Sequence, residues 1–326
     1  MIISRTPLRV SFLGGGSDLP IYYQRQGGAV LSTAIDQSVY VTVSRKFDNA
    51  VRVSYSRTEE VRHASEVKHP LVREALNMLG IDGGIEITSI ADIPAKGTGL
   101  GSSSSFTVGL LNALHAYCGR HVPAEKLALE SCLVEIERCG EPIGKQDQYA
   151  AAFGGFNFIR FHPDERVEVN KIICSPSAIS SLQDRLMFFY TGITRSASAL
   201  LQRQSQEMAT DVRKSQAMAN IVQLAEEAYT ELCAGNVSTL GEMLHDAWQI
   251  KKRLTNGISN TTIDDAYQAA IDAGAKGGKL LGAGGGGFLM LYAEPAHHDE
   301  IRRALISLRE TPFRFAAQGS SIIFVH

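Results

Sequence analysis

Short apolar runs with alternating side chains characterise residues 1–90 of the chain. Val, Ile, Thr and aromatic residues at every second position favour β-strands because they suit the pleated backbone. Within 69–80 the apolar residues instead recur at helical spacing, and Gly80 ends that pattern. The alternating runs predict strands at 8–13, 29–35, 38–44, 50–55 and 84–90. This part of the chain is therefore expected to be a sheet with one helix.

Helical spacing of apolar residues dominates the remainder. It predicts helices at 102–117, 124–139, 145–153, 196–234, 237–254, 262–274 and 296–308. Strand-like runs interrupt these helices at 155–161, 184–191, 287–293 and 320–325. The mixture predicts an α+β fold. The last two strand-like runs and the helix between them form a β–α–β order, which we assign to a second lobe.

The chain has 326 residues, whereas a single hydrophobic core stops growing at about 250–300 residues. We therefore expect two lobes, residues 1–184 and residues 185–326. No segment rich in Pro or Ser marks the boundary between them.

Composition excludes several classes of protein. The 32 Lys and Arg residues nearly balance the 34 Asp and Glu residues, without blocks of like charge, so we expect no nucleic acid and no polybasic membrane contact. The apolar runs are shorter than the roughly 20 residues that span a bilayer. The five cysteines have no CxxC spacing, and no signal-peptide segment opens the chain. We expect a reduced, cytoplasmic protein, and a homodimer stays open.

The strongest candidate site is PAKGTGLGSSSSFTVGLL, residues 94–111. Gly97, Gly99 and Gly101 lack Cβ atoms, so the backbone N–H groups can turn inward, and the serines that follow open a helix with a partly positive N-terminus. This pattern predicts a phosphate-binding loop. It is not a Walker A loop, because no lysine follows the last glycine. The simpler alternative is a flexible loop with a serine N-cap.

A second glycine-rich segment, KLLGAGGGGFLMLY (279–292), contains a literal GxGxxG match. A dinucleotide-binding fingerprint follows a strand and opens a helix, whereas these glycines precede a strand. We therefore expect a loop that crosses close to a ligand or to the first glycine segment. A plain hairpin turn is the alternative.

A third segment, RTPLRVSFLGGGSDLP (5–20), places Arg9 in a strand and Asp18 just after three glycines. A surface or paired arginine and a turn aspartate would explain these two residues equally well. A fourth segment, IERCGEPIGKQDQYAAAFGG (136–155), places Asp147 in the first turn of a helix, and Glu135 lies just before it. Taken alone, Asp147 is explained by the helix dipole and Glu135 by a solvated face.

A further anion site is suggested by YTGITRSASALL, residues 190–201. Here Thr194, Arg195 and Ser196 stand at the start of a long predicted helix, where amides, hydroxyls and a guanidinium could converge. Ordinary helix capping with an exposed Arg195 is the alternative. Lys145, near Asp147, is a second candidate for the same anion.

Taken together, these segments resemble the GHMP small-molecule kinases, which include galactokinase, homoserine kinase and mevalonate kinase. The three motifs of that family match TPLRVSFLGGGSD, PAKGTGLGSSSSF and KLLGAGGGGF, which together extend over nearly the whole chain. The resemblance implies an α+β, two-lobed GHMP kinase fold, with a ribosomal-protein-S5-like N-terminal lobe and a ferredoxin-like C-terminal lobe. It also implies ATP and Mg²⁺, and an active site between the lobes.

The resemblance further implies roles for individual residues. Asp147 matches the catalytic base of the galactokinase and mevalonate kinase branches, and Arg9 matches the basic residue beside that base. Ser103, or its neighbour Ser102, and Glu135 would lie near Mg²⁺, with Glu137 as the alternative to Glu135. The ATP phosphates would contact Gly97, Gly99, Leu100, Gly101, Ser102, Ser103 and Ser104, and the supporting loop would comprise Gly282, Gly284 and Gly285.

Within the family, RTPLRVSFLGGGSDLP, YYQRQGGAVLSTAID and GEPIGKQDQYAAAFGGFN resemble the D-glycero-D-manno-heptose 7-phosphate kinases, which produce the 1,7-bisphosphate for nucleotide-activated heptose biosynthesis. Galactokinases carry an acidic residue and a histidine where this chain has Gly15 and Gly16, which we expect to leave space for a larger sugar phosphate. The expected substrate-binding residues are Gly15, Gly16, Ser17, Asp18, Lys145 and Arg195. A GHMP kinase for an unphosphorylated sugar such as fucose and a non-catalytic sugar sensor remain as alternatives.

Overall fold

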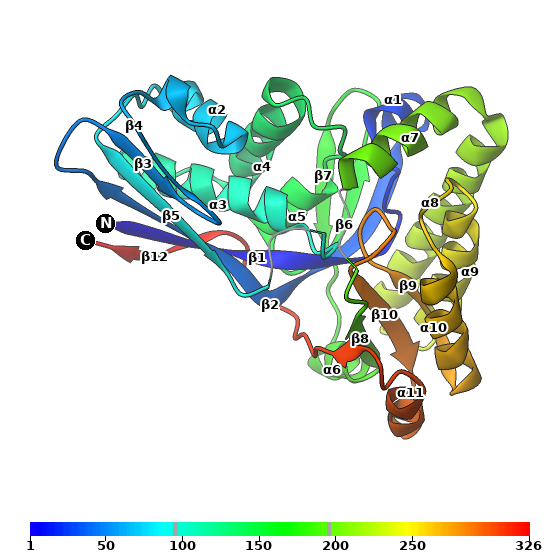
Figure 1. The fold of residues 1–326 in the computed structure, drawn as a ribbon. Helices are drawn as coiled ribbons and strands as arrows, with labels where there is room; N and C mark the ends of the chain where they lie inside the picture. The colour runs from blue at the N-terminus through cyan, green and yellow to red at the C-terminus, as the bar shows by residue number, and fades with distance from the viewer. Residues whose placement is uncertain (94–96, 194–196) are drawn as a thin grey trace.

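The structure is a computed structural model that describes residues 1–93, 97–193 and 197–326. Its helices and strands are organised around two sheets, a large one and a smaller one (Figure 1). No helix in these ranges is long and apolar enough to cross a membrane. The α+β fold class with two lobes that the sequence predicts is confirmed.

The large sheet has eight strands within the described residues, and most neighbours run antiparallel. Along its main path the order is β12-β1-β2-β5-β3-β4, and β6 pairs with β2 and with β7. The strands are β1 (Ile2–Leu13), β2 (Gly28–Arg45), β3 (Val51–Ser54), β4 (Thr58–Val61), β5 (Ile85–Ala91), β6 (Phe156–Phe161), β7 (Val167–Lys171) and β12 (Ser321–Val325).

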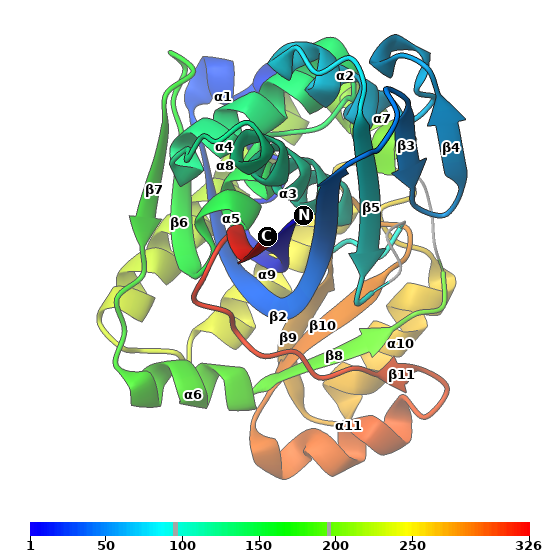
Figure 2. The same cartoon turned by 90° about the vertical axis from the view of Figure 1, so that its left-hand side faces the viewer.

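Two strands differ from the sequence-based expectation. The expected separate strands at 29–35 and 38–44 form one long strand, β2, because β1 pairs with both halves across a register shift between Pro7 and Arg9. The strand at 320–325 was expected in the second lobe, and this is wrong: β12 pairs antiparallel with β1, beside the N-terminus (Figure 2). The Met1 amino group donates to the backbone oxygen of His326 at 2.7 Å, which holds the two ends of the chain together.

Four helices lie along one side of the large sheet, and the longest of them, α3, packs against β1 and β2 (Figure 1). They are α2 (Pro70–Leu79), α3 (Ser102–Tyr117), α4 (Ala124–Cys132) and α5 (Gln146–Phe153). The predicted helix at 124–139 changes character near its end, because Leu133–Arg138 is a π-helical segment that continues α4. Such widened turns are rare and are often found at functional sites.

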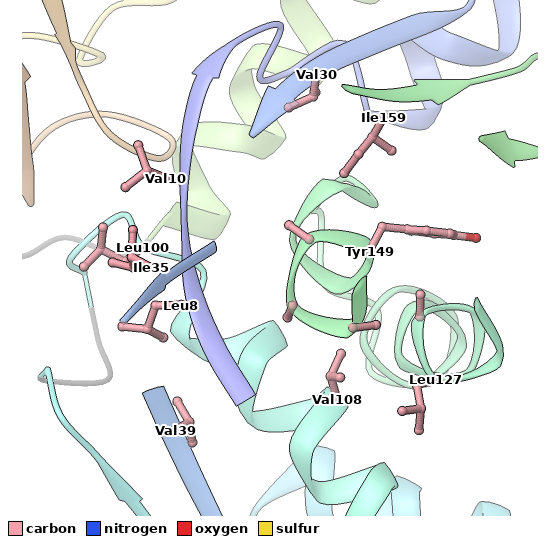
Figure 3. Close-up of a cluster of buried hydrophobic side chains, with 14 of the residues drawn as sticks. Leu8, Val10, Val30, Ile35, Val39, Leu100, Val108, Leu127, Tyr149 and Ile159 are labelled. Atoms are coloured by element: carbon pink, nitrogen blue, oxygen red, sulfur yellow. The ribbon is translucent and has the colours of Figure 1, made fainter. Parts of the chain in front are cut away.

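Buried side chains on both sides of β1 fix the direction of its residues. Leu8 and Val10 are fully buried on one side of the strand, near Ile35 and Leu100, whereas Val108 of α3 and Tyr149 of α5 lie on the other side (Figure 3). Because side chains alternate along a strand, Arg9 points to the opposite side from Leu8 and Val10. The packing of β1 therefore decides where the Arg9 guanidinium lies.

The smaller sheet has the order β11-β8-β10-β9 within the described residues, and all of its pairs are antiparallel. Its strands are β8 (Leu186–Tyr190), β9 (Ala275–Leu280), β10 (Phe288–Ala293) and β11 (Arg309–Glu310). The remaining helices are α1 (Pro20–Gln26), α6 (Pro176–Asp184), α7 (Ala197–Thr210), α8 (Val212–Cys233), α9 (Leu240–Lys252), α10 (Thr261–Asp272) and α11 (His298–Ala304). The expected division between residues 184 and 185 stays a prediction.

Helix α9 approaches strand β9 closely because both carry a glycine at the contact. A Cβ atom added to Gly277 of β9 would lie 2.0 Å from the backbone oxygen of Gly241 in α9, and one added to Gly241 would lie 2.7 Å from the Tyr292 ring. Two side chains cannot fit there. This contact sets the position of α9 relative to the glycine-rich loop that follows β9.

We predict that Gly277→Ala lowers the free energy of unfolding by about 1–3 kcal/mol, since the new methyl group must push α9 away from β9. Thermal or urea unfolding measures the change. Lys276→Ala, at the exposed neighbouring position of the same strand, is the matched control and should change the free energy of unfolding by less than about 1 kcal/mol. Equal stability of the two variants would contradict the close contact.

Candidate active site

A cavity of 660 Å³ lies where several loops and helix ends meet. Its wall combines residues of the first glycine segment, the start of α3, the loop before α5, the start of α7 and the end of α9. The second glycine-rich segment contributes Gly282 and Ala283. Both sheets therefore supply residues to the same cavity.

The Arg9 side chain, in the cavity wall, makes three hydrogen bonds. Its Nε and one terminal nitrogen each donate to a different Asp147 carboxylate oxygen at 2.8 Å, and the other terminal nitrogen donates to the backbone oxygen of Gly99 at 2.6 Å. The Arg9 side chain is 4% exposed and that of Asp147 is 23% exposed. A two-pronged pair of this kind fixes both the position and the plane of the carboxylate. Asp147 keeps one side open to the cavity.

The N-terminus of α3 opens into the same cavity. Gly101 precedes the helix with a φ of 77°, and no side chain caps the first turn. Ser102, Ser103 and Ser104 line the cavity there. The unsatisfied N–H groups and the dipole of a 16-residue helix favour an anion at this end. Leu100 anchors the preceding loop, because its side chain is fully buried and its oxygen accepts from the Arg9 amide at 3.0 Å.

The two glycine-rich segments contact each other directly. A Cβ atom on Gly99, where φ is 78°, would lie 2.3 Å from the Leu281 oxygen, and one on Gly282 would lie 2.6 Å from the Gly99 Cα atom. The second segment is also a hairpin connection, because β9 and β10 pair antiparallel on either side of it. The segment is thus both a loop that contacts the first glycine segment and a hairpin turn. Gly284 and Gly285 contact Ile258 instead of the cavity, and the Gly285 amide donates to the Ile258 oxygen at 2.9 Å.

Glu135 lies behind the start of α3, in the π-helical segment that continues α4. It is 1% exposed and accepts from Ser103 at 3.0 Å, from Ser104 at 2.7 Å and from Gln148 at 2.5 Å. Burial raises the pKa of Glu135 to about 7, although the three hydrogen bonds act in the opposite direction. Glu137, the alternative residue, is exposed. Glu135, and not Glu137, therefore contacts the serines.

These residues fit a magnesium ion that would bind together with phosphates. Mg²⁺ prefers oxygen ligands and is held in kinases by few protein groups, because phosphates and waters complete its shell. Ser103 and Glu135 offer a hydroxyl and a carboxylate, and the neighbouring Ser102 hydroxyl is buried with no hydrogen-bond partner in the part of the chain that the structure describes. In the described part of the chain, no group of three or more His, Cys, Asp or Glu side chains could hold a metal by itself.

Asp18 forms another part of the cavity wall. It is 2% exposed, and its carboxylate accepts from the Gly16 amide at 2.9 Å and from the Gln146 amide at 3.1 Å. Burial raises the pKa of Asp18, and the nearby Asp147 carboxylate raises it further. Gly144 passes so close that a Cβ atom there would lie 1.9 Å from Asp18 Oδ2.

The expectation that Gly15 and Gly16 leave open space is wrong at Gly16. A side chain at this position would meet the Gln204 amide nitrogen at 2.8 Å and the end of Met218 at 3.0 Å, so other side chains already fill that space. At Gly15 the Gln146 amide lies 3.5 Å from the Cβ position. The two glycines therefore admit two glutamine amides to the cavity wall.

Two expected substrate-binding residues, Ser17 and Lys145, are placed differently, and a third lies outside the described residues. The Ser17 hydroxyl donates to the Ala29 oxygen at 3.0 Å and is fully buried outside the cavity wall. Lys145 also does not line the cavity, because it pairs with Glu165 and its ammonium lies 4.9 Å from the centre of the Tyr23 ring. Arg195, with Thr194 and Ser196, lies outside the described residues.

Lys251 and Gln204 also line the cavity, and our sequence-based expectations did not include them. In the sequence, Lys251 resembles an ordinary basic residue at a helix C-terminus. Helical spacing could have identified it, because Leu244, Trp248 and Lys251 share the buried face of α9, whereas Lys252 does not. Gln204 is likewise on the buried face of α7, with Met208. A polar residue at an apolar helical position is the signal in both cases.

Comparison with known proteins agrees with this geometry. The sequence profile of the GHMP kinases N terminal domain matches residues 65–155, and that of the GHMP kinases C terminal matches residues 228–309. A D-glycero-alpha-D-manno-heptose 7-phosphate kinase of Campylobacter jejuni is 30% identical, and the match covers 93% of each chain. A bifunctional fucokinase/GDP-fucose pyrophosphorylase of Arabidopsis thaliana is 26% identical over 92% of this chain and 30% of that protein. The crystal structure of a D-glycero-D-manno-heptose 1-phosphate kinase of Bacteroides thetaiotaomicron matches with a TM-score of 0.81 at 25% identity, covering 100% of both chains.

We predict that Gly99→Ala weakens ATP binding about tenfold, equivalent to about 1.4 kcal/mol, because the loop must move away from Leu281 and take its amides with it. Isothermal titration calorimetry measures the affinity. Gly119→Ala is the matched control, because its φ of 72° is similar but nothing lies within 4 Å of the new Cβ atom. If the two variants bind ATP equally well, the Gly99 contact does not position the loop.

Proposed function

The chain belongs to the GHMP kinase family and is an ATP-dependent sugar kinase, and on this premise we propose that it phosphorylates the anomeric hydroxyl of D-glycero-D-manno-heptose 7-phosphate. The product is the 1,7-bisphosphate, an intermediate for nucleotide-activated heptose. The similarity to the Campylobacter heptose 7-phosphate kinase, which extends along nearly the whole chain, supports this choice of acceptor.

One observation carries the assignment of a phosphoryl-transfer site. The end of the first glycine segment lies against the Arg9 and Asp147 pair: a Cβ atom on Gly101 would be 3.2 Å from Arg9 Cγ and 3.3 Å from Asp147 Oδ2. Phosphates at the start of α3 would therefore lie next to a fixed carboxylate. Phosphoryl transfer needs this adjacency of donor phosphate and acceptor hydroxyl, because positioning and charge stabilisation supply most of its catalysis.

The start of α3 would bind the phosphates of ATP. The N–H groups of its first turn have no capping side chain and face the cavity, so a phosphate can accept from them. Gly99 and Gly101 allow the loop to approach, since both adopt a backbone conformation that other residues disfavour. Contact with Leu281 and Gly282 supports the loop from behind.

Asp147 would accept the proton of the acceptor hydroxyl. Arg9 uses one lone pair on each carboxylate oxygen, and a carboxylate has about four such positions, so at least one stays free toward the cavity. The pair with Arg9 orients that free position. General-base catalysis by a positioned carboxylate contributes about 10²–10⁴-fold.

Ser103 and Glu135 would hold Mg²⁺, with the Ser102 hydroxyl nearby. When bound with ATP, Mg²⁺ would neutralise charge on the phosphate oxygens. Ser103 would have to turn its hydroxyl away from Glu135 for both to contact the ion. Ser104 and Gln148 would keep the Glu135 carboxylate in place during this change.

The acceptor would bind beside Asp147, against the loop that carries Asp18. The Gln146 Oε1 and Gln204 Nε2 atoms are buried there without a hydrogen-bond partner among the described residues, and both residues line the cavity. One free acceptor and one free donor suit the hydroxyl groups of a sugar, each of which can donate and accept. Leaving both unpaired would cost about 1–3 kcal/mol per group, so a polar ligand is favoured.

A kinase for an unphosphorylated sugar such as fucose is the second candidate, because 92% of this chain matches a part of the plant fucokinase/GDP-fucose pyrophosphorylase. A non-catalytic sugar sensor is disfavoured, since Arg9, Glu135 and Asp147 are all present and Arg9 and Asp147 are paired.

We predict that the purified chain releases ADP fastest with D-glycero-D-manno-heptose 7-phosphate. The reason is that its sequence identity to the heptose 7-phosphate kinase, 30%, exceeds its identity to the fucokinase protein, 26%. A coupled ADP-release assay with heptose 7-phosphate, unphosphorylated heptose, fucose, mannose and galactose measures this preference. A higher kcat/KM for fucose, or for any unphosphorylated sugar, would reject the proposed acceptor in favour of the second candidate.

We predict that Asp147→Asn binds ATP normally but loses about 10²–10⁴-fold in kcat, because an amide cannot take up the hydroxyl proton. Steady-state kinetics measures kcat, and calorimetry confirms ATP binding. Asp164→Asn, in the exposed turn before β7, is the control and should keep normal turnover. Turnover of Asp147→Asn within a few fold of the unaltered protein would remove Asp147 from the role of base.

A further inference from the structure

Lys251, near the C-terminal end of α9, occupies a position that the roles given above do not use. It is 7% exposed, it lines the cavity, and its ammonium donates to the Gly282 oxygen at 3.0 Å. Gly282 in turn contacts Gly99, whose oxygen accepts from Arg9 at 2.6 Å. Two glycines therefore separate Lys251 from the Arg9 and Asp147 pair.

The Lys251 ammonium has unused hydrogen-bonding capacity. Lysine carries three N–H donors, and a single bond, to Gly282, is present for Lys251 among the described residues. No carboxylate forms an ion pair with Lys251 within the described residues. Burial lowers the pKa of Lys251 to about 8, and the Arg9 charge acts in the same direction, whereas Asp18 and Asp147 oppose it. A bound anion would supply the missing partner.

The pairing of the charged side chains in the cavity wall leaves Lys251 available for an anion. Five charged side chains line the cavity among the described residues: Arg9, Asp18, Glu141, Asp147 and Lys251. Asp147 neutralises Arg9, Asp18 accepts from backbone amides, and Glu141 accepts from Ser198 at 2.8 Å. Lys251 is thus the lining cation in the described ranges that is not in an ion pair. Lys279, also buried, donates to the Phe12 oxygen and does not line the cavity.

We propose that Lys251 is a catalytic residue of this kinase, whose ammonium contacts the oxygens of the phosphoryl group while that group passes from ATP to the acceptor hydroxyl. The inference rests on the proposed binding of the ATP phosphates at the start of α3. No lysine follows Gly101 in the sequence, so the start of α3 lacks the lysine that a Walker A loop carries at this point.

In this step the bond between the γ-phosphorus and the oxygen that bridges to the β-phosphate breaks, and its electron pair stays on ADP. A new bond forms between that phosphorus and the acceptor oxygen, whose proton goes to Asp147. Lys251 donates to the outer oxygens of the phosphoryl group throughout and is unchanged at the end. A preorganised cation in a desolvated wall needs little rearrangement, which favours its contribution to the transition state.

The test compares Lys251→Met with the unaltered enzyme on the acceptor that the unaltered enzyme uses fastest. We expect kcat to fall about 10²–10³-fold, as for other single donors aimed at a transition state. The slow hydrolysis of ATP by water should fall by a similar factor, because it transfers the same phosphoryl group. Thermal stability should be maintained, because methionine replaces a desolvated ammonium by an apolar side chain of similar length.

Three further variants separate charge from structure. Lys252→Met is the matched control. The Lys252 ammonium pairs with Asp264 at 3.3 Å, and Lys252 does not line the cavity, so kcat of this variant should stay normal. Lys251→Arg keeps the charge and should retain more activity than Lys251→Gln, which keeps a donor for Gly282 without the charge. If Lys251 only supported the loop, the two variants would have similar activity, because both keep a donor for the Gly282 oxygen.

The proposal is overturned if kcat of Lys251→Met stays within threefold of normal. It is also overturned if ATP hydrolysis by water is unchanged while the KM for a phosphorylated acceptor rises, because Lys251 would then bind the acceptor's own phosphate. These results are distinct from failure of the proposed acceptor, which the substrate comparison alone decides. A Lys251→Arg variant that is folded but inactive would also overturn the proposal, because a positive charge at this position would then not support phosphoryl transfer.

Discussion

The ion pair between Arg9 and Asp147 is the interaction on which the geometry of the site depends. It joins β1 of the large sheet to the first turn of α5, and the third Arg9 donor holds the Gly99 oxygen in the first glycine segment. Truncating either side chain to alanine would leave the other group buried or half-buried without a hydrogen-bonding partner, which is destabilising. The same pair that is proposed to orient the base therefore also fixes the loop that is proposed to bind ATP.

A second constraint is the absence of side chains where the two glycine-rich segments meet. The Gly99 and Gly282 contact brings a loop between strands of the smaller sheet against a loop that precedes α3 on the large sheet. The Gly241 and Gly277 contact then sets α9 against β9, so that Lys251 reaches the Gly282 oxygen. Backbone contacts of this kind fix the two segments closely relative to each other, because no flexible side chain lies between them. The cavity is consequently built from parts of both sheets.

The sequence predicts those features that depend on local spacing. Glycines before a serine-rich helix start, and the alternation that directs Arg9 away from Leu8 and Val10, are readable because they follow from neighbouring residues alone. Lys251 and Gln204 are not, since their role arises only where helices distant in the chain pack against the cavity. Lys145 was predicted to bind substrate because it lies close to Asp147 in the sequence. Its ammonium instead contacts Glu165 and Tyr23, which are distant in the sequence. The pairing of β12 with β1 is equally non-local.

The charge of the cavity wall bears on how nucleotide and metal would bind. Asp18, Glu141 and Asp147 outnumber Arg9 and Lys251 among the described lining residues, so the wall alone cannot balance the charges of ATP. Glu135 adds a further carboxylate behind Ser103, and burial with a pKa of about 7 leaves it partly protonated near neutrality in the unliganded protein. A divalent cation arriving with the nucleotide would favour its ionised form, since an opposite charge nearby stabilises a carboxylate. The same cation would reduce the repulsion between phosphates and carboxylates. Nucleotide and cation are therefore expected to bind as one unit, with the amides of α3 and the Lys251 ammonium balancing the charge that remains.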